Sequence, residues 1–251
     1  MVKGGAVKGG VKSGGPRKDG IAGRSVARQT VIRVKTAKRR SAASTQWLAR
    51  QLNDPYVGEA KRQGYRSRAA FKLLQLDDRF HLLRPGRRIV ELGCAPGGWT
   101  QVAVERVKPT IGKGEAGQGA VIGIDILPMD AVPGAAVIEL DFLAPAAPDR
   151  LKALLSGPAD VVLSDMAAPT TGHGSTDHIR IVALAEAAYE FAREVLAPGG
   201  TFLCKVFQGG AEGGLLAVLK RDFKAVRHAK PPASRAESAE VYVVATGFRG
   251  K

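Results

Sequence analysis

The sequence predicts an α/β fold built on a mostly parallel, doubly wound sheet, and three observations lead to this prediction. From Arg88 onward, short apolar runs alternate with helical patterns, the order of elements that places parallel strands side by side in one sheet. A glycine-rich turn follows the first run, and an acidic residue follows each of the next three runs. Open α/β sheets bind ligands at the carboxyl ends of their strands, so these groups mark one candidate site.

The elements themselves follow from the spacing of apolar side chains. Two helices are expected before the sheet: one capped by Ser44 or Thr45, with Trp47 and Leu52 on its apolar side, and a second that begins near Ser67. Strands are expected over residues 88–93, 119–126, 135–142, 159–165, 201–207, 224–229 and 240–247, and further helices over 98–107, 146–155, 177–196 and 211–222.

Two connections refine the topology. The segment between the second and third strands is too short for a helix, so a loop or turn is expected there. The last two strands follow each other without a helix, which predicts an antiparallel strand at the end of a seven-stranded sheet.

Length and charge divide the chain into a domain and an arm. With 251 residues, 45% of them hydrophobic, the chain suffices for one substantial core, and we expect a single domain over residues 46–251. Residues 1–45 hold twelve Lys or Arg, one acid and eight glycines, a composition that predicts a disordered basic arm. The net charge of +15 and a pI near 10.2 favour nucleic acid as partner over an anionic membrane surface.

Cysteine usage and hydropathy indicate the compartment. Cys94 and Cys204 both lie in apolar, strand-like runs and predict neither a disulfide framework nor a zinc cluster. No apolar run approaches the roughly 18 residues of a membrane span, and the N-terminal residues lack the apolar region of a secretory signal. A cytoplasmic protein without a membrane partner is therefore expected.

The glycine-rich turn indicates the kind of ligand. Gly93, Gly97 and Gly98 give the spacing G-x-x-x-G-G, which is neither the G-x-G-x-x-G of dinucleotide sites nor a phosphate loop with its Lys and Ser or Thr. S-adenosylmethionine suits this turn better than NAD or ATP. Trp99 follows directly, and it either lines the methionine end of the cofactor pocket or packs in the core.

Acidic residues follow the second, third and fourth strands. Asp125 is placed to accept hydrogen bonds from both ribose hydroxyls of the cofactor, and Asp141 to reach its exocyclic adenine amine. Asp165 ends the fourth strand. A single strand-end acid is more often a turn residue, but three such acids beside the glycine turn predict a cofactor site.

Four residues suggest catalysis: Lys72, Asp165, Lys205 and Glu240. Lys205 interrupts an apolar strand, where a lysine either reaches solvent or needs a partner, because an unpaired buried ammonium is costly. If Asp165 and Glu240 from neighbouring strands pair with Lys205, they stabilise its buried ammonium, and the charged groups together form a candidate catalytic site.

Several segments together resemble the FtsJ/RrmJ family of ribosomal RNA large-subunit 2'-O-methyltransferases. The resemblance runs from about Ser41 to Gly247, with the motifs in matching order. It is carried by residues 67–73, 91–101, 125–130, 164–167, 196–200, 205–209 and 234–242. Departures are modest: Glu91 stands where an Asp is common, Cys94 where a small residue is common, and most of the basic arm extends beyond the compact bacterial form.

The resemblance implies a Rossmann-like, S-adenosylmethionine-dependent methyltransferase fold and a catalytic tetrad of Lys72, Asp165, Lys205 and Glu240. It also implies cofactor contacts by Gly97, Trp99, Asp125, Asp141 and Asp165. The family's usual target is a uridine ribose in the A-loop of 23S rRNA within the large ribosomal subunit.

The tetrad fits the chemistry of methylating a ribose hydroxyl. The hydroxyl is a poor nucleophile and the methyl sulfonium is already activated, so the enzyme needs alignment and the removal of one proton, and no metal. The hypothesis is that Lys205 accepts the proton and Lys72 steers the hydroxyl, while Asp165 and Glu240 hold the two ammonium groups.

Basic side chains outside the tetrad form the expected RNA surface. For any one of them, an ordinary solvated charge is the alternative, and for the arm a basic tail that aids solubility. The predicted RNA-binding residues are Arg39, Arg40, Arg66, Arg68 and Arg235.

Three other functions stay open from the sequence: a tRNA ribose methyltransferase, a dinucleotide-dependent oxidoreductase, and a non-enzymatic RNA-binding factor in ribosome assembly. The glycine spacing disfavours the oxidoreductase, and an assembly factor leaves the lysines and Glu240 unexplained. The sequence is silent on the oligomeric state, and we take a monomer as the working expectation.

Overall fold

The computed structural model describes residues 1, 32–109, 119–169, 171–208 and 213–250. In this part of the chain, seven strands form one sheet in the order β3-β2-β1-β4-β5-β7-β6. The strands are β1 (Arg88–Leu92), β2 (Ala120–Asp125), β3 (Ala135–Glu139), β4 (Ala159–Ser164), β5 (Leu196–Phe207), β6 (Phe223–Ala229) and β7 (Glu240–Phe248). Strands β1 to β5 pair in parallel, and β7 runs antiparallel between β5 and β6, which confirms the predicted fold class.

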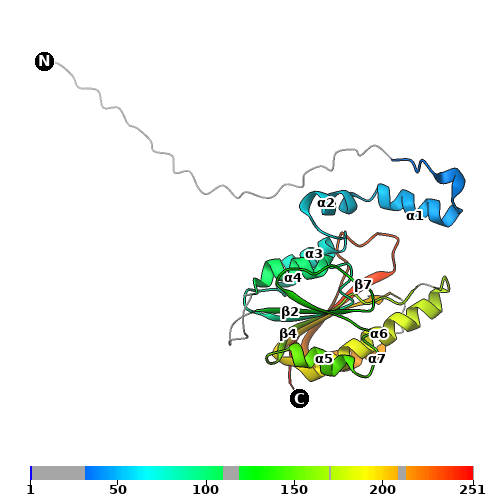
Figure 1. The fold of residues 1–251 in the computed structure, drawn as a ribbon. Helices are drawn as coiled ribbons and strands as arrows, with labels where there is room; N and C mark the ends of the chain where they lie inside the picture. Colours follow the sequence, from blue (N-terminus) through cyan, green and yellow to red (C-terminus); the bar gives the residue numbers. More distant parts are fainter. Residues whose placement is uncertain (2–31, 110–118, 170, 209–212, 251) are drawn as a thin grey trace.

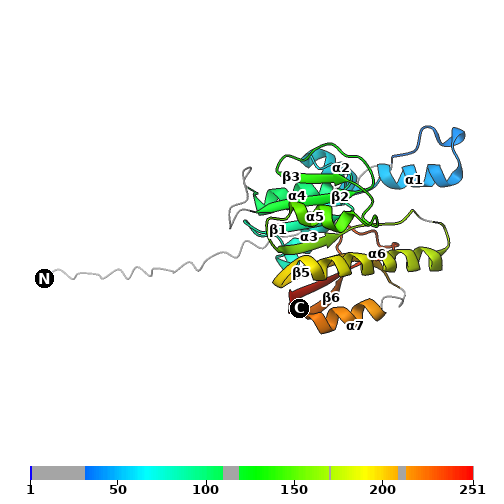
Figure 2. The ribbon, with the colours of Figure 1, turned by 60° about the horizontal axis from the view of Figure 1, so that its bottom comes forward.

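Helices cover both faces of the sheet. Figure 1 shows α3 and α4 on one face and α5, α6 and α7 on the other, while Figure 2 shows α1 extending beyond the body of the domain. The helices are α1 (Ala42–Leu52), α2 (Pro55–Gln63), α3 (Ala70–Phe80), α4 (Gly98–Val107), α5 (Ala147–Leu154), α6 (Gly174–Val195) and α7 (Gly213–Asp222).

The strands are apolar at consecutive positions because both faces of the sheet are covered. Ile89, Val121 and Val161 pack towards α3 and α4. The next residue of the same strand points the other way, so that Val90 and Ile122 pack with α5, α6 and α7. This doubly wound packing fixes the strand ends, and with them the acids and the glycine turn that follow.

Two strands differ from the prediction in where they begin or end. β3 ends at Glu139 and not at residue 142, because the chain turns where the Asp141 carboxylate accepts a hydrogen bond from the Leu143 amide at 2.9 Å. β5 begins at Leu196, five residues before the predicted start. The connection from Asp125 to Ala135 is described throughout and contains no helix, as predicted.

The N-terminal helices differ more. α1 is capped by Ser41, whose hydroxyl accepts from the Ser44 amide at 3.2 Å, so the prediction of Ser44 or Thr45 as cap was wrong. The second helix, α3, begins at Ala70, near the predicted start. α2 was not predicted, and the side chain of Trp47 lies outside the described residues.

Most of the predicted basic arm, residues 2–31, also lies outside the described residues, so its disorder stays a prediction. Its last part contains a short 3-10 helix, Ala37–Arg39, and the first turn of α1. Ile32 is tied to the end of α1, since its amide donates to the Asn53 side chain at 2.7 Å. No helix in the described ranges is long and apolar enough to cross a membrane.

Candidate active site

The glycine turn joins β1 to α4 and requires glycine for conformational and steric reasons. Gly93 and Gly97 have φ angles of +81° and +104°. A Cβ atom on Gly93 would lie 2.9 Å from the backbone of Met166, and one on Gly98 would overlap the Ser67 hydroxyl. The turn therefore brings the backbone of β1 directly against the chain that leaves β4.

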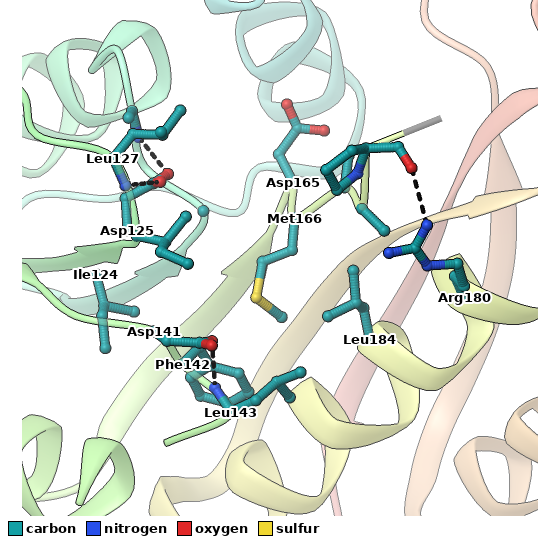
Figure 3. A pocket seen from close by; sticks show the side chains of 16 residues that line it. Ile124, Asp125, Leu127, Asp141, Phe142, Leu143, Asp165, Met166, Arg180 and Leu184 are labelled. Carbon is teal, nitrogen blue, oxygen red and sulfur yellow. Dashed lines mark hydrogen bonds between the residues drawn. The ribbon is translucent and has the colours of Figure 1, made fainter. Parts of the chain in front are cut away.

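A cavity of about 450 Å³ opens at the carboxyl ends of the first four strands. Asp125 lines it from the end of β2, Asp141 and Asp165 line it just after the ends of β3 and β4, and Gly93 lines it from the turn (Figure 3). We call it the carboxylate cavity. The structure therefore brings together the three acids that the sequence singled out.

The carboxylates of this cavity are held in place by backbone amides. Asp125 accepts from the amides of Ala95 at 2.7 Å and Leu127 at 2.9 Å, and Asp141 accepts from that of Leu143. Because each carboxylate oxygen has two lone pairs, both side chains retain acceptor capacity for ligand hydroxyls or amines.

Apolar side chains complete the wall. Ile126, Leu127 and Leu143 line the cavity and are 64%, 60% and 60% exposed, an unusual state for large hydrophobic residues gathered at one place. A cavity of this size with an apolar wall and a few oriented polar groups is typical of a small-molecule site. An adenosine-like ligand suits this cavity. Its flat adenine ring would cover the two leucines and the isoleucine, and its ribose hydroxyls would meet Asp125.

Trp99 and its neighbours are placed differently. In the described part of the chain, Trp99, Gly97 and Gly98 are not among the residues that line the carboxylate cavity. Trp99 is 2% exposed, its indole donates to the Ala69 carbonyl at 2.8 Å, and its ring packs 5.6 Å from that of Tyr242. The structure thus shows the packing role of Trp99, and its contact with a cofactor stays a prediction.

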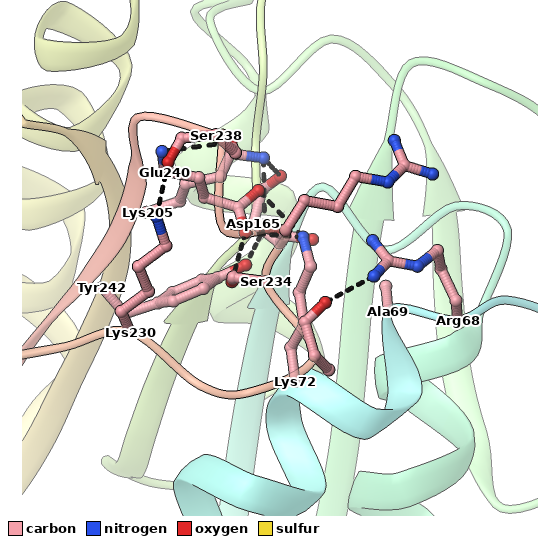
Figure 4. Close-up of polar contacts among 12 residues, drawn as sticks. Arg68, Ala69, Lys72, Asp165, Lys205, Lys230, Ser234, Ser238, Glu240 and Tyr242 are labelled. Atoms are coloured by element: carbon pink, nitrogen blue, oxygen red, sulfur yellow. Dashed lines mark hydrogen bonds and ion pairs between the residues drawn. The ribbon is translucent and has the colours of Figure 1, made fainter. Parts of the chain in front are cut away.

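The four residues predicted as catalytic converge beside the carboxylate cavity (Figure 4). Lys72, from the first turn of α3, lies 2.7 and 2.8 Å from the two carboxylate oxygens of Glu240. Lys205 lies 3.0 Å from a carboxylate oxygen of Asp165 and donates to its carbonyl at 2.6 Å. Both lysines are only 8% exposed, so each buried ammonium has the partner that its burial requires.

Strand register explains why these groups meet. β5 and β7 are antiparallel, with Lys205 opposite Tyr242 and Phe207 opposite Glu240. Side chains two residues apart on a strand share a face, so Glu240, Tyr242 and Lys205 all point towards α3 and Lys72.

Tyr242 belongs to this group of buried polar side chains, although it is not among the predicted site residues. Its side chain is fully buried and its hydroxyl donates to Asp165 at 2.9 Å. Burial, followed by the charges of Asp165 and Glu240, raises the pKa of Tyr242 well above its ordinary value, so the phenol keeps its proton and stays a donor. Its period-two spacing from Glu240 was the signal that could have revealed it.

Glu240 is itself ordered by two partners. Burial, the largest single cause, opposes its ionisation, but Lys72, Ser234 and Lys205 together outweigh burial, and the pKa of Glu240 lies below its ordinary value. The Ser234 hydroxyl donates to the same carboxylate at 2.8 Å. Glu240 is therefore a charged anchor for Lys72.

Glu91 is a buried carboxyl that makes a different contact. It is 1% exposed and accepts from the Thr100 hydroxyl at 2.7 Å, while its other oxygen has no hydrogen-bond partner among the described residues. Burial, with smaller contributions from Asp165 and Asp125, raises the pKa of Glu91 to about 8.

A second cavity, of about 330 Å³, is lined in part by Lys72 and Glu240. We call it the arginine cavity because Arg50, Arg68 and Arg235 line it. Asp165 lines the carboxylate cavity, whereas Lys72 and Glu240 line the arginine cavity. The four residues thus lie between a site suited to a nucleoside-like ligand and a basic pocket.

The predicted RNA-binding arginines divide into three groups. Arg68 and Arg235 line the arginine cavity. Arg66 donates to the carbonyls of Pro96, Asp130 and Ala131, so its guanidinium braces the glycine turn. The two from the basic arm, Arg39 and Arg40, are exposed at and directly after the 3-10 helix.

Comparisons with known proteins agree with this geometry. Residues 65–248 match the model of the family described as FtsJ-like methyltransferase. Ribosomal RNA large subunit methyltransferase E from Paramagnetospirillum magneticum is 68% identical over 219 residues, covering 87% of this chain and 88% of that protein. The protein of the same name from Parvibaculum lavamentivorans is 64% identical over 222 residues, covering 88% and 87%.

A solved structure supports the same assignment. A crystal structure described as that of a ribosomal RNA methyltransferase from Plasmodium falciparum matches with a TM-score of 0.65 and 32% identity, covering 74% of this chain and all of that one. The family match spans every residue that lines the carboxylate cavity and every member of the predicted tetrad. This chain therefore belongs to the FtsJ-like methyltransferase family.

Proposed function

We propose that this protein transfers a methyl group from S-adenosylmethionine to a ribose 2'-hydroxyl of ribosomal RNA. The observation that carries the proposal is the position of Lys72, Asp165, Lys205 and Glu240 between the carboxylate cavity and the arginine cavity. A methyl donor on one side and an RNA ribose on the other would meet at these four residues.

The carboxylate cavity would hold the donor. Asp125 would accept hydrogen bonds from the ribose hydroxyls of the donor, Asp141 from its adenine amine, and the exposed leucines and isoleucine would cover the adenine ring. When bound, S-adenosylmethionine supplies a methyl group already activated by the positive sulfur. Glycine at position 93 keeps the wall of the cavity close to β4.

The tetrad would align and deprotonate the acceptor. Lys72, anchored by Glu240, would steer the ribose oxygen, and Lys205, beside Asp165, would accept its proton. S-adenosylmethionine bound beside the tetrad would supply the methyl group that this oxygen takes up, and its sulfur would leave as a thioether. Tyr242 holds Asp165 in place through its hydrogen bond.

Ribosomal RNA is the acceptor that the relatives favour. The similar proteins from P. magneticum and P. lavamentivorans are named ribosomal RNA large subunit methyltransferases. The charge of +15 also suits a polyanionic substrate. Within the large subunit we propose a uridine in the A-loop of 23S rRNA as the target and the cytoplasm as the location, with tRNA as the alternative acceptor.

Methyl transfer with mapping of the product tests the proposal. Large ribosomal subunits from cells that lack the protein are incubated with tritium-labelled donor, and the labelled nucleoside is identified. We expect label on a uridine ribose of 23S rRNA. Label on a base, or transfer to tRNA alone, would contradict the proposed acceptor.

Replacement of Lys205 tests the catalytic assignment. Lys205→Ala removes the proposed proton acceptor, and general-base contributions are typically 10²–10⁴-fold, so we expect a loss of about 10²-fold or more in kcat. Binding of S-adenosylhomocysteine, measured by calorimetry, should stay within about twofold because Lys205 is not among the residues lining the carboxylate cavity as the structure describes it. Methylation at the parent rate would show that Lys205 is not the base.

A further inference from the structure

We propose that the arginine cavity is a subsite for the RNA phosphodiester next to the acceptor ribose, and that Asp54 is the positioning residue that holds its arginines. The inference rests on the proposed function, and it assigns a role to an acid that no motif of the sequence singled out. Asp54 is a buried carboxylate that contacts two of the arginines lining the arginine cavity.

Asp54 is shared by two guanidinium groups. One of its oxygens lies 2.8 Å from Nε of Arg68 and 3.2 Å from Nη2 of Arg235. The side chain of Asp54 is 6% exposed, compared with 17% for Arg68 and 27% for Arg235. One buried carboxylate therefore neutralises only one of two positive charges, and the arginines lie on its solvent side.

The pair is further fixed by neighbouring contacts. Arg68 also donates to the Ala233 carbonyl at 2.5 Å, and its guanidinium lies 5.9 Å from the centre of the Tyr56 ring. The Ala233 amide donates in turn to the Gln75 side chain of α3 at 2.7 Å. These contacts bind the loop that carries Arg235 to the helix that carries Lys72.

The same loop is braced at its other end. Lys230 donates to the carbonyls of Ala236 at 3.0 Å and Ser238 at 2.6 Å. The Ser238 hydroxyl accepts from the Glu240 amide at 3.2 Å. The arginines of the cavity and the Lys72–Glu240 pair thus form one connected unit, in which Arg68 lies beside Lys72 (Figure 4).

The chemistry of RNA explains what such a unit would bind. A ribose bears its 2'-hydroxyl next to the 3'-oxygen, which carries a phosphodiester, so a ribose placed at Lys72 brings a phosphate to the adjoining pocket. Planar guanidinium groups bind phosphate oxygens in a directed way, and Arg50 from α1 adds a third such group. Phosphate contacts position the substrate, and Asp54 would keep two of these arginines aimed at it.

Asp54 offers a substitution that separates positioning from folding. Its other oxygen caps α2 by accepting from the Tyr56 amide at 3.0 Å, and serine caps helices about as well as aspartate. Asp54→Ser therefore removes the shared carboxylate but keeps the cap. Glu59→Ser is a matched control, because Glu59 lies on the same helix, pairs with exposed Arg62 and is not among the residues described as lining the arginine cavity.

The experiment measures methyl transfer to undermethylated large subunits and, separately, binding to oligouridylate over a range of salt concentrations. For Asp54→Ser we expect kcat/KM for the subunits to fall about tenfold, with KM for the methyl donor unchanged. Its affinity for oligouridylate should not fall, since the substitution removes a negative charge from the protein. Arg235→Ala should lower kcat/KM and reduce the salt slope of binding to large-subunit RNA by about one.

The outcomes are distinct. The positioning role would be overturned if Asp54→Ser kept the parent activity, or if Glu59→Ser lost as much activity as Asp54→Ser. It would also be overturned if Asp54→Ser lost oligouridylate affinity and thermal stability along with its activity. An unchanged salt slope in Arg235→Ala would overturn the subsite. Failure of the parent protein to methylate subunits would refute the proposed function alone, because the salt slopes still test the subsite without catalysis.

Discussion

Two buried carboxyl groups near the site behave in opposite ways. Glu240 has a lowered pKa because Lys72, Ser234 and Lys205 together outweigh the effect of burial. Glu91 has a raised pKa of about 8 because burial dominates and its hydrogen-bond partner, Thr100, is neutral. At neutral pH the first is an anion that organises a cation, and the second is mainly a neutral acid in the core.

The raised pKa of Glu91 gives a pH dependence of stability. The folded state holds this proton more tightly than the unfolded state, so its contribution is fully present below about pH 4.5 and is lost as the pH rises through about 8. Glu91→Gln removes this titration. As the pH rises, we expect the free energy of unfolding of the variant to increase relative to that of the parent, by on the order of 1 kcal/mol per pH unit.

Urea unfolding at several pH values measures this difference. The range of about pH 5 to 8 lies between the pKa of Glu91 in the unfolded protein and its pKa in the folded protein. Glu186→Gln, on the exposed side of α6, serves as the control and should show a constant difference. Parallel curves for Glu91→Gln and the parent would mean that Glu91 is ionised in the folded protein.

Individual residues also show what the sequence could predict. Lys72, Asp165, Lys205 and Glu240 were named in advance, because each stands in a recognisable motif or interrupts an apolar pattern. Asp54 was not, because its pairing with arginines 14 and 181 positions away depends on tertiary contacts that no local pattern reveals.

At the level of elements, the glycine turn between β1 and α4 has two structural roles. It lets β1 approach β4, and it lines the carboxylate cavity. Its positive φ angles and the absence of space for a Cβ atom are independent reasons for glycine at position 93. A side chain there would disturb both the packing and the ligand site.

Gly93→Ala should therefore lower stability by about 2 kcal/mol or more, through the strained φ angle and the overlap with Met166. Binding of S-adenosylhomocysteine should weaken with it. Gly58→Ala, in the interior of α2 with open space around it, is the control and should raise stability by about 0.5–1 kcal/mol.

Denaturant unfolding and calorimetry measure the two effects. Equal stability of Gly93→Ala and the parent would show that the turn relaxes, and that glycine is not needed for packing at this position.

The elements themselves were predicted unevenly. Buried strands were found because their apolar runs are continuous, and the loop between β2 and β3 because its length excludes a helix. α2 was missed, although Asp54 before Pro55 is a typical helix start, because its short polar sequence shows little apolar periodicity. The end of β3 was misplaced because Asp141 turns the chain through its own side chain.

At the scale of the whole molecule, charge is the dominant feature. Residues 2–31 contain seven Lys or Arg and one Asp, so their removal lowers the net charge from +15 to +9. A basic segment of this kind would add affinity for RNA mainly through counterion release, which depends on salt and not on sequence.

A variant without residues 2–31 should therefore bind large-subunit RNA more weakly at low salt and with a smaller salt slope. The difference from the parent should vanish at high salt, and donor binding should not change. Filter binding over a salt series measures this effect. A variant with the same residues in scrambled order is the control, and its failure to restore binding would show that the arm makes specific contacts.

The position of β7 has a consequence for the timing of synthesis. β7 follows all the other described strands in the chain, yet it occupies an inner position between β5 and β6 and carries Glu240 and Tyr242. While the ribosome is still translating the preceding strands, Lys72 has no carboxylate anchor and Asp165 lacks its phenol donor. The contacts that hold Lys72 and Asp165 therefore form only after β7, the last described strand in the chain, has been synthesised.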